Sequence, residues 1–250
     1  MKMKHVLFNI LSISAIMFLI GFASVDNNRR KCNQLIISID NQLDNHFIDE
    51  NDVLQMITNG YTEAIEGVAF KDLNVRSLEN RIIGNSYVKE SEVFRDLKGN
   101  LLVNVTLRRP IARITRNDGP DAYVAEDGRI LPVSEKFSSR VILISGMSTS
   151  EIVKLESLAS DDYSKLYELI NFINSDTFWK AQIAQVVIED NNEILLLPQV
   201  TKQNIEFGDL NNIENKFRRL EIFYKEILPR KGWNTYSRVN VTYNNQIICE

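Results

Sequence analysis

The sequence contains few of the residues that build metal and catalytic sites. Its 250 residues include only two histidines and two cysteines. His5 borders an apolar run and His46 stands alone, and neither has a partner that indicates a base or a ligand. Cys32 and Cys249 lack metal-ligand spacing, and a bridge between them would nearly close the chain into a ring. We therefore expect two unpaired thiols and no metal site.

The common catalytic motifs are also missing. No Gly-x-Ser-x-Gly elbow, glycine-rich phosphate loop or His-Glu-x-x-His sequence occurs. Acidic runs at residues 49–52 and 161–162 stand at predicted helix starts, where stabilisation of the helix dipole explains them better than metal binding does. We expect no enzyme activity, no catalytic residue and no cofactor. A hydrolase that uses a pair of carboxylates would leave no trace in the spacing, so this alternative stays open.

Positive charge is not in excess. Lys and Arg number 29 against 33 Asp and Glu, which gives a formal net charge of −4. Because nucleic-acid binding is driven by phosphate neutralisation, this balance argues against nucleic acid as a partner. Hydrophobic residues make up 44% of the chain, enough to bury a core. We expect a folded protein with neither a nucleic-acid partner nor a small-molecule substrate.

Only one apolar run is long enough to span a membrane. Residues 6–23 carry no charge, and a helix of this length, at about 1.5 Å per residue, just crosses a bilayer core. A cleaved signal peptide is the competing interpretation, because Gly21-Phe22-Ala23 loosely resembles a cleavage site. The length of the run favours an uncleaved transmembrane helix. Residues 1–5 would then form a short cytoplasmic tail, although basic residues on both sides leave the orientation open on charge alone.

The next segment, residues 32–108, predicts an α+β unit of the order β-α-α-β-β. A β-branched strand comes first, at residues 34–40. Two helices follow, with Asp49 and Asn74 as their N-caps. Residues 87–108 then alternate with a period of two across a short turn, which is typical of paired strands. One thin sheet with two helices on one face would bury both apolar surfaces.

Two arginines and a proline end the last of these strands. Pro110 lacks the N–H that ladder pairing needs, so the strand is expected to stop before it. We expect Arg108 and Arg109 to leave the core for water at this point. The site marks a predicted boundary between residues 32–108 and a second domain at residues 109–250.

The second segment predicts a mixed domain with an antiparallel sheet and two or more helices. Hairpins are indicated at residues 123–134 and 182–200, and helices at residues 161–174 and 209–228. Asp209 is the predicted N-cap of the last helix. Four basic residues are expected on its outer face: Lys216, Arg218, Arg219 and Lys225.

The chain closes with one more predicted strand. Apolar and polar residues alternate along this strand, so we expect one face to be packed against the core and the other to be wet, that is, exposed to water. The packed side would carry Val239, Val241 and Tyr243, and the wet side Arg238, Asn240 and Thr242.

This order of parts resembles the FtsQ/DivIB family of bacterial cell-division proteins. A β-α-α-β-β module just outside a single N-terminal anchor is similar to a POTRA domain. A second similarity lies in residues 87–114, which read YVKESEVFRDLKGNLLVNVTLRRPIARI. In the family, the first domain ends in a strand that is followed by Arg, one residue, and Pro-Ala or a similar pair. The matching residues here are Arg108, Arg109, Pro110, Ile111 and Ala112. FGD, a Lys-bearing amphipathic helix and a final strand also resemble the way in which the family's second domain, here residues 109–250, closes.

The resemblance implies a non-enzymatic scaffold of the divisome with a single membrane span. It implies binding to the small coiled-coil division proteins FtsB (DivIC) and FtsL outside the cytoplasmic membrane, which helps to localise and regulate septal peptidoglycan synthesis. The expected mode is β-augmentation, in which a partner peptide adds a strand to an open edge of the last strand. The partner-binding residues would be Tyr236, Arg238, Val239, Asn240, Val241, Thr242, Tyr243 and Asn244.

One position departs from the family pattern. Family members often carry Arg-Tyr in the last strand, and here Tyr243 matches the tyrosine while Thr242 stands in place of the arginine. In place of the missing arginine at position 242, Arg238 is expected to make the charge contact with an acidic residue of the partner. An ordinary packed strand aromatic is the simpler interpretation of Tyr243.

An alternative from another class is an anchored extracytoplasmic enzyme, or an outer-membrane biogenesis factor, that shares the POTRA unit. A biogenesis factor would add POTRA repeats or a barrel of alternating strands, and neither is visible. An enzyme predicts a deep polar pocket with perturbed ionisable groups. A scaffold predicts an open strand edge and no such pocket.

Overall fold

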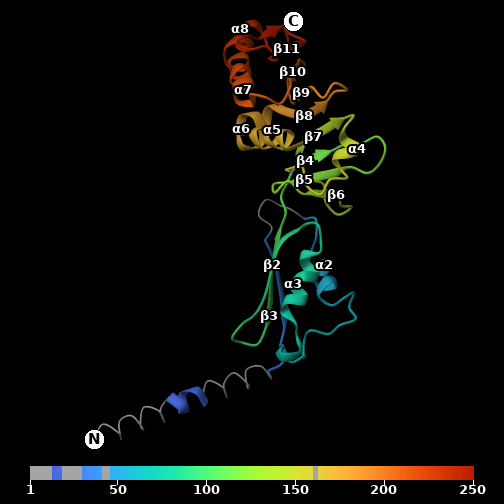
Figure 1. The fold of residues 1–250 in the computed structure, drawn as a ribbon, viewed down its shortest axis with the longest axis vertical. Helices are drawn as coiled ribbons and strands as arrows, with labels where there is room; N and C mark the ends of the chain where they lie inside the picture. The colour runs from blue at the N-terminus through green and yellow to red at the C-terminus, as the bar shows by residue number, and fades with distance from the viewer. Residues whose placement is uncertain (1–12, 19–29, 41–45, 160–162) are drawn as a thin grey trace, which may run out of the picture. The chain divides into compact units, whose positions relative to one another are not determined.

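A computed structural model describes residues 13–18, 30–40, 46–159 and 163–250. The chain divides into two compact units, Met1–Leu107 and Arg108–Glu250, whose elements are labelled in Figure 1. Residues 13–18 are helical, and no helix in the described ranges is both long and apolar enough to cross a membrane. The predicted tail and most of the predicted span at residues 6–23 fall outside the described residues.

The first unit is a three-stranded sheet with two helices on one face (Figure 1). β1 (Leu35–Asp40) pairs in parallel with β3 (Leu101–Leu107), which pairs antiparallel with β2 (Val88–Arg95). α2 (Glu50–Ile57), the short helix η1 (Phe70–Asp72) and α3 (Val75–Ile83) lie between β1 and β2 in the chain. The predicted β-α-α-β-β order is confirmed. Its core joins the helix residues Val53, Ile57, Leu78 and Ile82 to the strand residues Val93, Val103 and Val105.

Local capping explains where both helices begin. Asp52 N donates to Asp49 Oδ1 over 3.0 Å and Asp49 N donates to Asp52 Oδ2 over 2.9 Å, which is a reciprocal capping box. Ser77 N donates to Asn74 Oδ1 over 3.1 Å at the start of α3. Both predicted N-caps are confirmed.

The second unit is built on a nine-stranded sheet in the order β12-β11-β10-β9-β8-β7-β4-β5-β6. The first six strands along the chain are β4 (Pro110–Ile114), β5 (Ala122–Ala125), β6 (Ile130–Pro132), β7 (Ile142–Gly146), β8 (Ile183–Ile188) and β9 (Ile194–Pro198). The remaining three are β10 (Asn204–Gly208), β11 (Arg238–Asn240) and β12 (Ile248–Cys249).

The sheet is mixed, so the prediction of an antiparallel sheet is wrong in part. β4 pairs in parallel with β7, β7 with β8, and β10 with β11. Parallel neighbours need a crossover connection, and intervening strands or helices supply each of these. The predicted hairpin at residues 182–200 is confirmed as β8 and β9, and Asn192 in its turn has a φ of 63°.

Helices cover one face of this sheet (Figure 1). They are α5 (Ser164–Ser175), α6 (Thr177–Gln182), α7 (Ile213–Ile222), the π-helical turn η3 (Phe223–Ile227) and α8 (Leu228–Lys231), while α4 (Thr149–Ile152) follows β7. Aromatic rings join them to the sheet, because Phe217 lies 4.8 Å from Trp179 and 5.3 Å from Phe207 between ring centroids. Cys32 in the first unit and Cys249 in the second are free thiols.

The last long helix begins later than the sequence predicts. α7 starts at Ile213, after Asn212 in a left-handed conformation with a φ of 53°. Asp209 does not cap it. Lys216 Nζ donates over 2.6 Å to both the carbonyl and Oδ1 of Asp209 and lies 5.0 Å from the Phe207 ring centroid. Lys216 is only 4% exposed, so its predicted place on the outer face is wrong.

The seam between the two segments also differs from prediction. Arg108 is 7% exposed, and its Nε donates to Asp127 Oδ2 over 2.9 Å. The prediction that Arg108 is exposed to water is therefore wrong. The side chain can be buried because a carboxylate from the β5–β6 turn balances its charge. Pro110 is the first residue of β4 and pairs with Ala125, and the first position of a strand tolerates proline.

Candidate partner-binding site

The C-terminal residues form one edge of the nine-stranded sheet. β11 lies between β10 on one side and β12 on the other. The expectation that the last predicted strand has an open side is therefore wrong for Arg238–Asn240. The physical reason is that the chain reverses at residues 244–247 and returns to pair with β11.

A polar turn breaks the predicted alternation after Val241. Asn240 Oδ1 accepts hydrogen bonds from Thr242 N over 2.9 Å and from Thr242 Oγ1 over 2.7 Å. Asn245 takes a positive φ of 60°, a conformation that asparagine tolerates in turns. Val239 and Val241 are buried as predicted. Tyr243 is exposed and Asn240 is buried, so the predicted packed position of Tyr243 and the predicted wet position of Asn240 are both wrong.

The open edge belongs to β12. Arg238 and Glu250 exchange both backbone hydrogen bonds, with N···O distances of 3.1 and 3.0 Å. Hydrogen-bonded and non-hydrogen-bonded pairs alternate along an antiparallel ladder, so Val239 and Cys249 form the non-bonded pair. The N–H and C=O groups of Cys249 consequently point away from β11. On that side, no further strand lies among the residues that the structure describes.

The charge of Arg238 is balanced within the chain. Its Nη2 donates to Glu206 Oε2 over 2.8 Å and its Nη1 donates to Glu250 Oε2 over 3.0 Å. Asn240 Nδ2 also donates to Glu206. The hydrogen bond from Arg238 lowers the pKa of Glu206, so this carboxylate stays ionised near neutral pH. The Arg238 guanidinium is thus engaged by carboxylates of its own unit, so a basic contact with a partner has to come from another residue.

A basic cleft of about 510 Å³ adjoins the open edge. One wall is a face of α7 that includes Arg218, Arg219 and Ile222, and the other is the turn at residues 244–247, which leads directly into β12. Arg219 Nη2 donates to the carbonyl of Val241 over 2.6 Å and so supports the turn. The Arg218 side chain is exposed and makes no hydrogen bond or ion pair with any residue that the structure describes. No acidic side chain is among those that line the cleft.

The structure therefore separates the residues predicted to bind a partner. Tyr236, Val239 and Val241 pack against the core, and the Tyr236 ring lies 6.0 Å from that of Phe223. Thr242 and Tyr243 lead into the turn. Sequence reasoning missed the basic cleft, because helix arginines indicate a solvated face by default. The strand at Ile248–Cys249 was also missed, because two residues are too few to show an alternating pattern of apolar and polar side chains.

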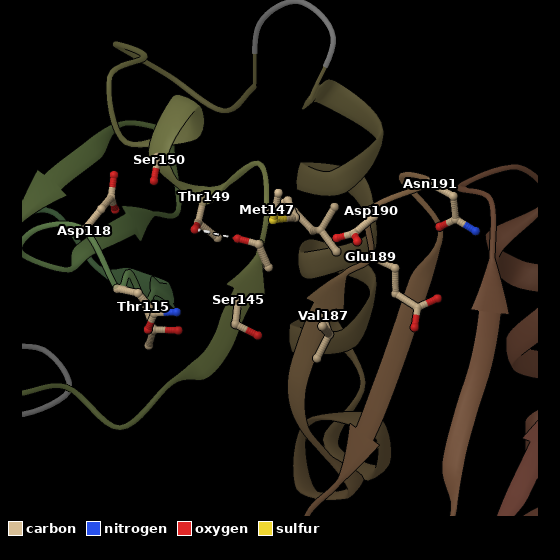
Figure 2. A pocket seen from close by; sticks show the side chains of 13 residues that line it. Thr115, Asp118, Ser145, Met147, Thr149, Ser150, Val187, Glu189, Asp190 and Asn191 are labelled. Carbon is tan, nitrogen blue, oxygen red and sulfur yellow. Dashed lines mark hydrogen bonds between the residues drawn. The ribbon is translucent and has the colours of Figure 1, made fainter.

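A second, polar cleft of about 950 Å³ lies where the parallel strands β4, β7 and β8 end (Figure 2). Figure 2 shows Thr115 and Asp118 after β4, Ser145 on β7, and Glu189 and Asp190 in the β8–β9 turn. The scaffold hypothesis predicted no deep polar pocket with perturbed ionisable groups. This cleft contains one perturbed carboxyl group, that of Asp118, but it is open to solvent and not deep. The carboxyl ends of parallel strands leave such a crevice at the edge of a sheet.

The polar cleft can bind a polar group, because hydroxyl and carboxylate side chains line it. Arg116 Nε donates to Asp118 Oδ1 over 2.9 Å and lowers the pKa of Asp118, so this carboxylate stays ionised. Gln185 Nε2 donates to Ser145 Oγ over 2.6 Å, and Thr149 Oγ1 donates to the Gly146 carbonyl over 2.8 Å. The residues that line the cleft include no histidine, cysteine or lysine that could activate a hydroxyl.

The first unit has the architecture of a POTRA-like module, and a second domain with a mixed sheet follows it. Residues 30–106 match the model of the POTRA-like domain, and residues 109–250 match that of the family described as FtsQ/DivIB, C-terminal related. The chain belongs to the FtsQ/DivIB family of cell-division proteins, and the predicted resemblance is confirmed.

A curated relative agrees with this assignment. The cell division protein FtsQ of Geotalea daltonii is 24% identical over 187 residues, which cover 74% of this chain and 66% of the relative. The chain thus spans just under two thirds of the length of that relative.

Proposed function

We propose that this chain is a non-enzymatic scaffold of the cell-division complex. Its partners are small coiled-coil proteins of the FtsB/DivIC and FtsL kinds, bound outside the cytoplasmic membrane. Through them it helps to localise and regulate septal peptidoglycan synthesis. Membership of the FtsQ/DivIB family supports this proposal.

The observation that carries the binding mode is an open strand edge beside a basic cleft. An extended partner segment adds a strand to β12 through the outward N–H and C=O groups of Cys249. An acidic side chain of the same segment reaches Arg218, which has no carboxylate partner in the described part of the chain. Backbone pairing sets the register, and the arginine contributes selectivity.

We further propose that residues 6–23 form an uncleaved single span of the cytoplasmic membrane. The run is uncharged, and the helical residues 13–18 leave Met17 and Phe18 at least 70% exposed. Apolar side chains in such a helix are typical of contact with lipid. Residues 1–5 then lie in the cytoplasm, and both units lie outside it.

A charge reversal tests the basic cleft. The full chain and the FtsB/DivIC-like protein of the same bacterium are co-expressed and purified together from solubilised membranes. Arg218→Glu is expected to reduce the co-purified partner about tenfold, equivalent to about 1.4 kcal/mol. The matched control is Lys202→Glu, an exposed lysine outside the cleft that should leave capture unchanged. Equal capture by both variants would contradict the proposed contact.

A short deletion tests the strand edge. Removal of residues 248–250 takes away β12 but leaves Val239 and Val241 in the core, which a deletion from residue 236 would not. We expect capture to be lost while the variant still unfolds cooperatively in circular dichroism. Full capture by the folded variant would refute docking at β12.

A further inference from the structure

The turn between β2 and β3 holds a leucine completely out in solvent. Leu97 is 100% exposed. Hydrogen bonds fix the turn around it: Asn100 N donates to Asp96 Oδ1 and Asn100 Nδ2 donates to Asp96 Oδ2, both over 2.8 Å. Gly99 completes the turn with a φ of +87°. One exposed leucine is common, but this one adjoins other exposed apolar side chains.

An apolar row continues from the turn across the helix-free face of the sheet. In the strand register, Leu102 lies opposite Ile36 on one side and opposite Phe94 on the other. Ile36 is 42% exposed and Phe94 is 43% exposed. The same face becomes acidic toward the other end of the sheet, where its side chains include Asp40, Glu90 and Glu92. One exposed lysine, Lys89, lies at the bulge beside Glu90.

The apolar end of this face is the end at which the chain enters the unit. Asn33 Nδ2 donates to the Lys98 carbonyl and Asn33 N donates to the Gly99 carbonyl, both over 2.8 Å. About ten residues separate Asn33 from the end of the apolar run at residues 6–23, a reach of at most about 35 Å. The acidic end lies a further seven residues along β2, or roughly 23 Å away.

Basic residues gather at the same end. Phe70 N donates to the Arg30 carbonyl over 3.0 Å, and the Arg95 guanidinium lies 4.7 Å from the Phe70 ring centroid. The basic residues of this end are Arg30, Lys31, Lys71, Arg95 and Lys98. Among its acidic residues, Asp96 accepts hydrogen bonds inside the turn, Glu66 accepts one from Leu35 N over 3.0 Å, and Asp72 is exposed beside Lys71.

We propose that this end of the POTRA-like unit rests on the outer surface of the cytoplasmic membrane. Leu97 inserts at the boundary between headgroups and acyl chains, with Phe94 and Ile36 beside it, and the basic residues approach anionic headgroups. The acidic end of the sheet points away from the surface, which sets the orientation of the unit. This inference rests on the proposed membrane span.

The size of the patch favours lipid over a protein partner. Leu97, which is fully exposed, and three partly exposed side chains offer on the order of a few hundred Å² of apolar surface. A stable protein interface buries about 800 Å² on each partner, which is more than this row supplies. A membrane contact needs less, because the span keeps the turn at a high effective concentration near the surface.

Spin labels on the full chain in vesicles of phosphatidylcholine and phosphatidylglycerol test the inference. The background is Cys249→Ser, because Cys249 is half-exposed whereas Cys32 is buried. A nitroxide is placed by Leu97→Cys or, at the acidic end of the same face, by Glu90→Cys as the matched control. Collision with oxygen reports lipid, and collision with a water-soluble nickel complex reports solvent.

We expect the label at position 97 to collide several-fold more with oxygen than with nickel, and the label at position 90 to show the reverse. Nickel accessibility at position 97 equal to that at position 90 means that water meets the turn, and low accessibility to both probes means that a second copy or another protein covers it. Either result would overturn the inference. A third label, from Ile16→Cys, reports the span separately. Lipid contact at position 16 with water at position 97 defeats only this inference, whereas water at both positions defeats the proposed span as well.

Discussion

Arg108 Nε lies 2.9 Å from Asp127 Oδ2 and joins the first residue of the second unit to the β5–β6 turn. The Arg108 side chain is almost fully buried, whereas that of Asp127 is about one-third exposed. A buried guanidinium requires a carboxylate nearby, since an unpaired buried charge is costly. The pair therefore fixes the start of β4, which follows Arg109 directly.

Asp127→Asn removes the charge but keeps an oxygen for the hydrogen bond from Arg129 N. We expect it to lower the unfolding free energy of the second unit by about 2 kcal/mol. Both tryptophans, Trp179 and Trp233, lie in this unit, so tryptophan fluorescence during denaturant unfolding reports its stability. Arg109→Ala, at the exposed neighbour, should change stability little, and an equal loss in both variants would disprove the role of the pair.

The Lys216–Asp209 pair gives the second unit a pH-dependent stability. The hydrogen bond from Lys216 lowers the pKa of Asp209 from 3.8 to about 2. Because the folded state then binds this proton less tightly than the unfolded state does, the contribution is complete above about pH 4 and is lost as the pH falls toward 2. We expect the unfolding free energy of the Asp209→Asn variant to fall less steeply than that of the wild type as the pH is lowered from about 4 to 2. Parallel curves for the variant and the wild type would show that the pair does not contribute.

A cluster of buried polar atoms near η3 is incompletely satisfied. Gln203 is fully buried, and its amide lies close to the Tyr224 hydroxyl, which is also close to Thr201. None of these side-chain groups makes a hydrogen bond of good geometry with a described protein atom. Burial raises the pKa of Tyr224. An amide buried without partners destabilises a fold, so Gln203→Met is expected to raise the unfolding free energy by about 1 kcal/mol.

Gln185→Met is the matched control for this prediction. Gln185 Nε2 donates to Ser145 Oγ over 2.6 Å, so the same substitution there should lower stability by about 1 kcal/mol. Thermal unfolding of both variants measures the difference. A loss of stability in Gln203→Met would mean that its amide is satisfied in solution.

Gly146 ends β7 at a point of close backbone approach. It has a φ of +121°, and a Cβ there would lie 1.9 Å from the Ile188 carbonyl oxygen. Gly146→Ala is expected to lower the unfolding free energy of the second unit by about 3 kcal/mol or more, because β7 and β8 must move apart. Gly67→Ala is the control, with a φ of +79° but open space around its Cβ, and should cost about 1 kcal/mol in the first unit. Similar losses in circular dichroism melts of the two variants would contradict the steric account.

Local signals in the sequence predict much of the fold. The N-caps Asp49 and Asn74 and the turn at Asn192 act through hydrogen bonds or backbone conformations a few residues apart, so the sequence alone exposes them. Alternation likewise predicts β2 and β3, since each of these strands has one buried face.

The failures share a non-local cause. Arg108 is buried because a carboxylate 19 positions away reaches it. Lys216 is buried because its ammonium reaches back to Asp209 and lies over Phe207. The last strand gains a neighbour because residues 244–247 turn the chain back on itself. Each outcome depends on which distant groups meet in space, and neither periodicity nor propensity carries that information.

The central claim is that a partner docks on the β12 edge of the sheet, and site-specific photo-crosslinking tests it most directly. A benzophenone amino acid replaces Ile248 in β12 or, as control, Pro132 in β6 at the opposite edge of the same sheet. The full chain is expressed in dividing cells of its own bacterium together with a tagged FtsB/DivIC-like protein. We predict a crosslinked adduct from position 248 and none from position 132. An adduct from position 132 alone, or none from position 248 while the two proteins still co-purify, would contradict the account.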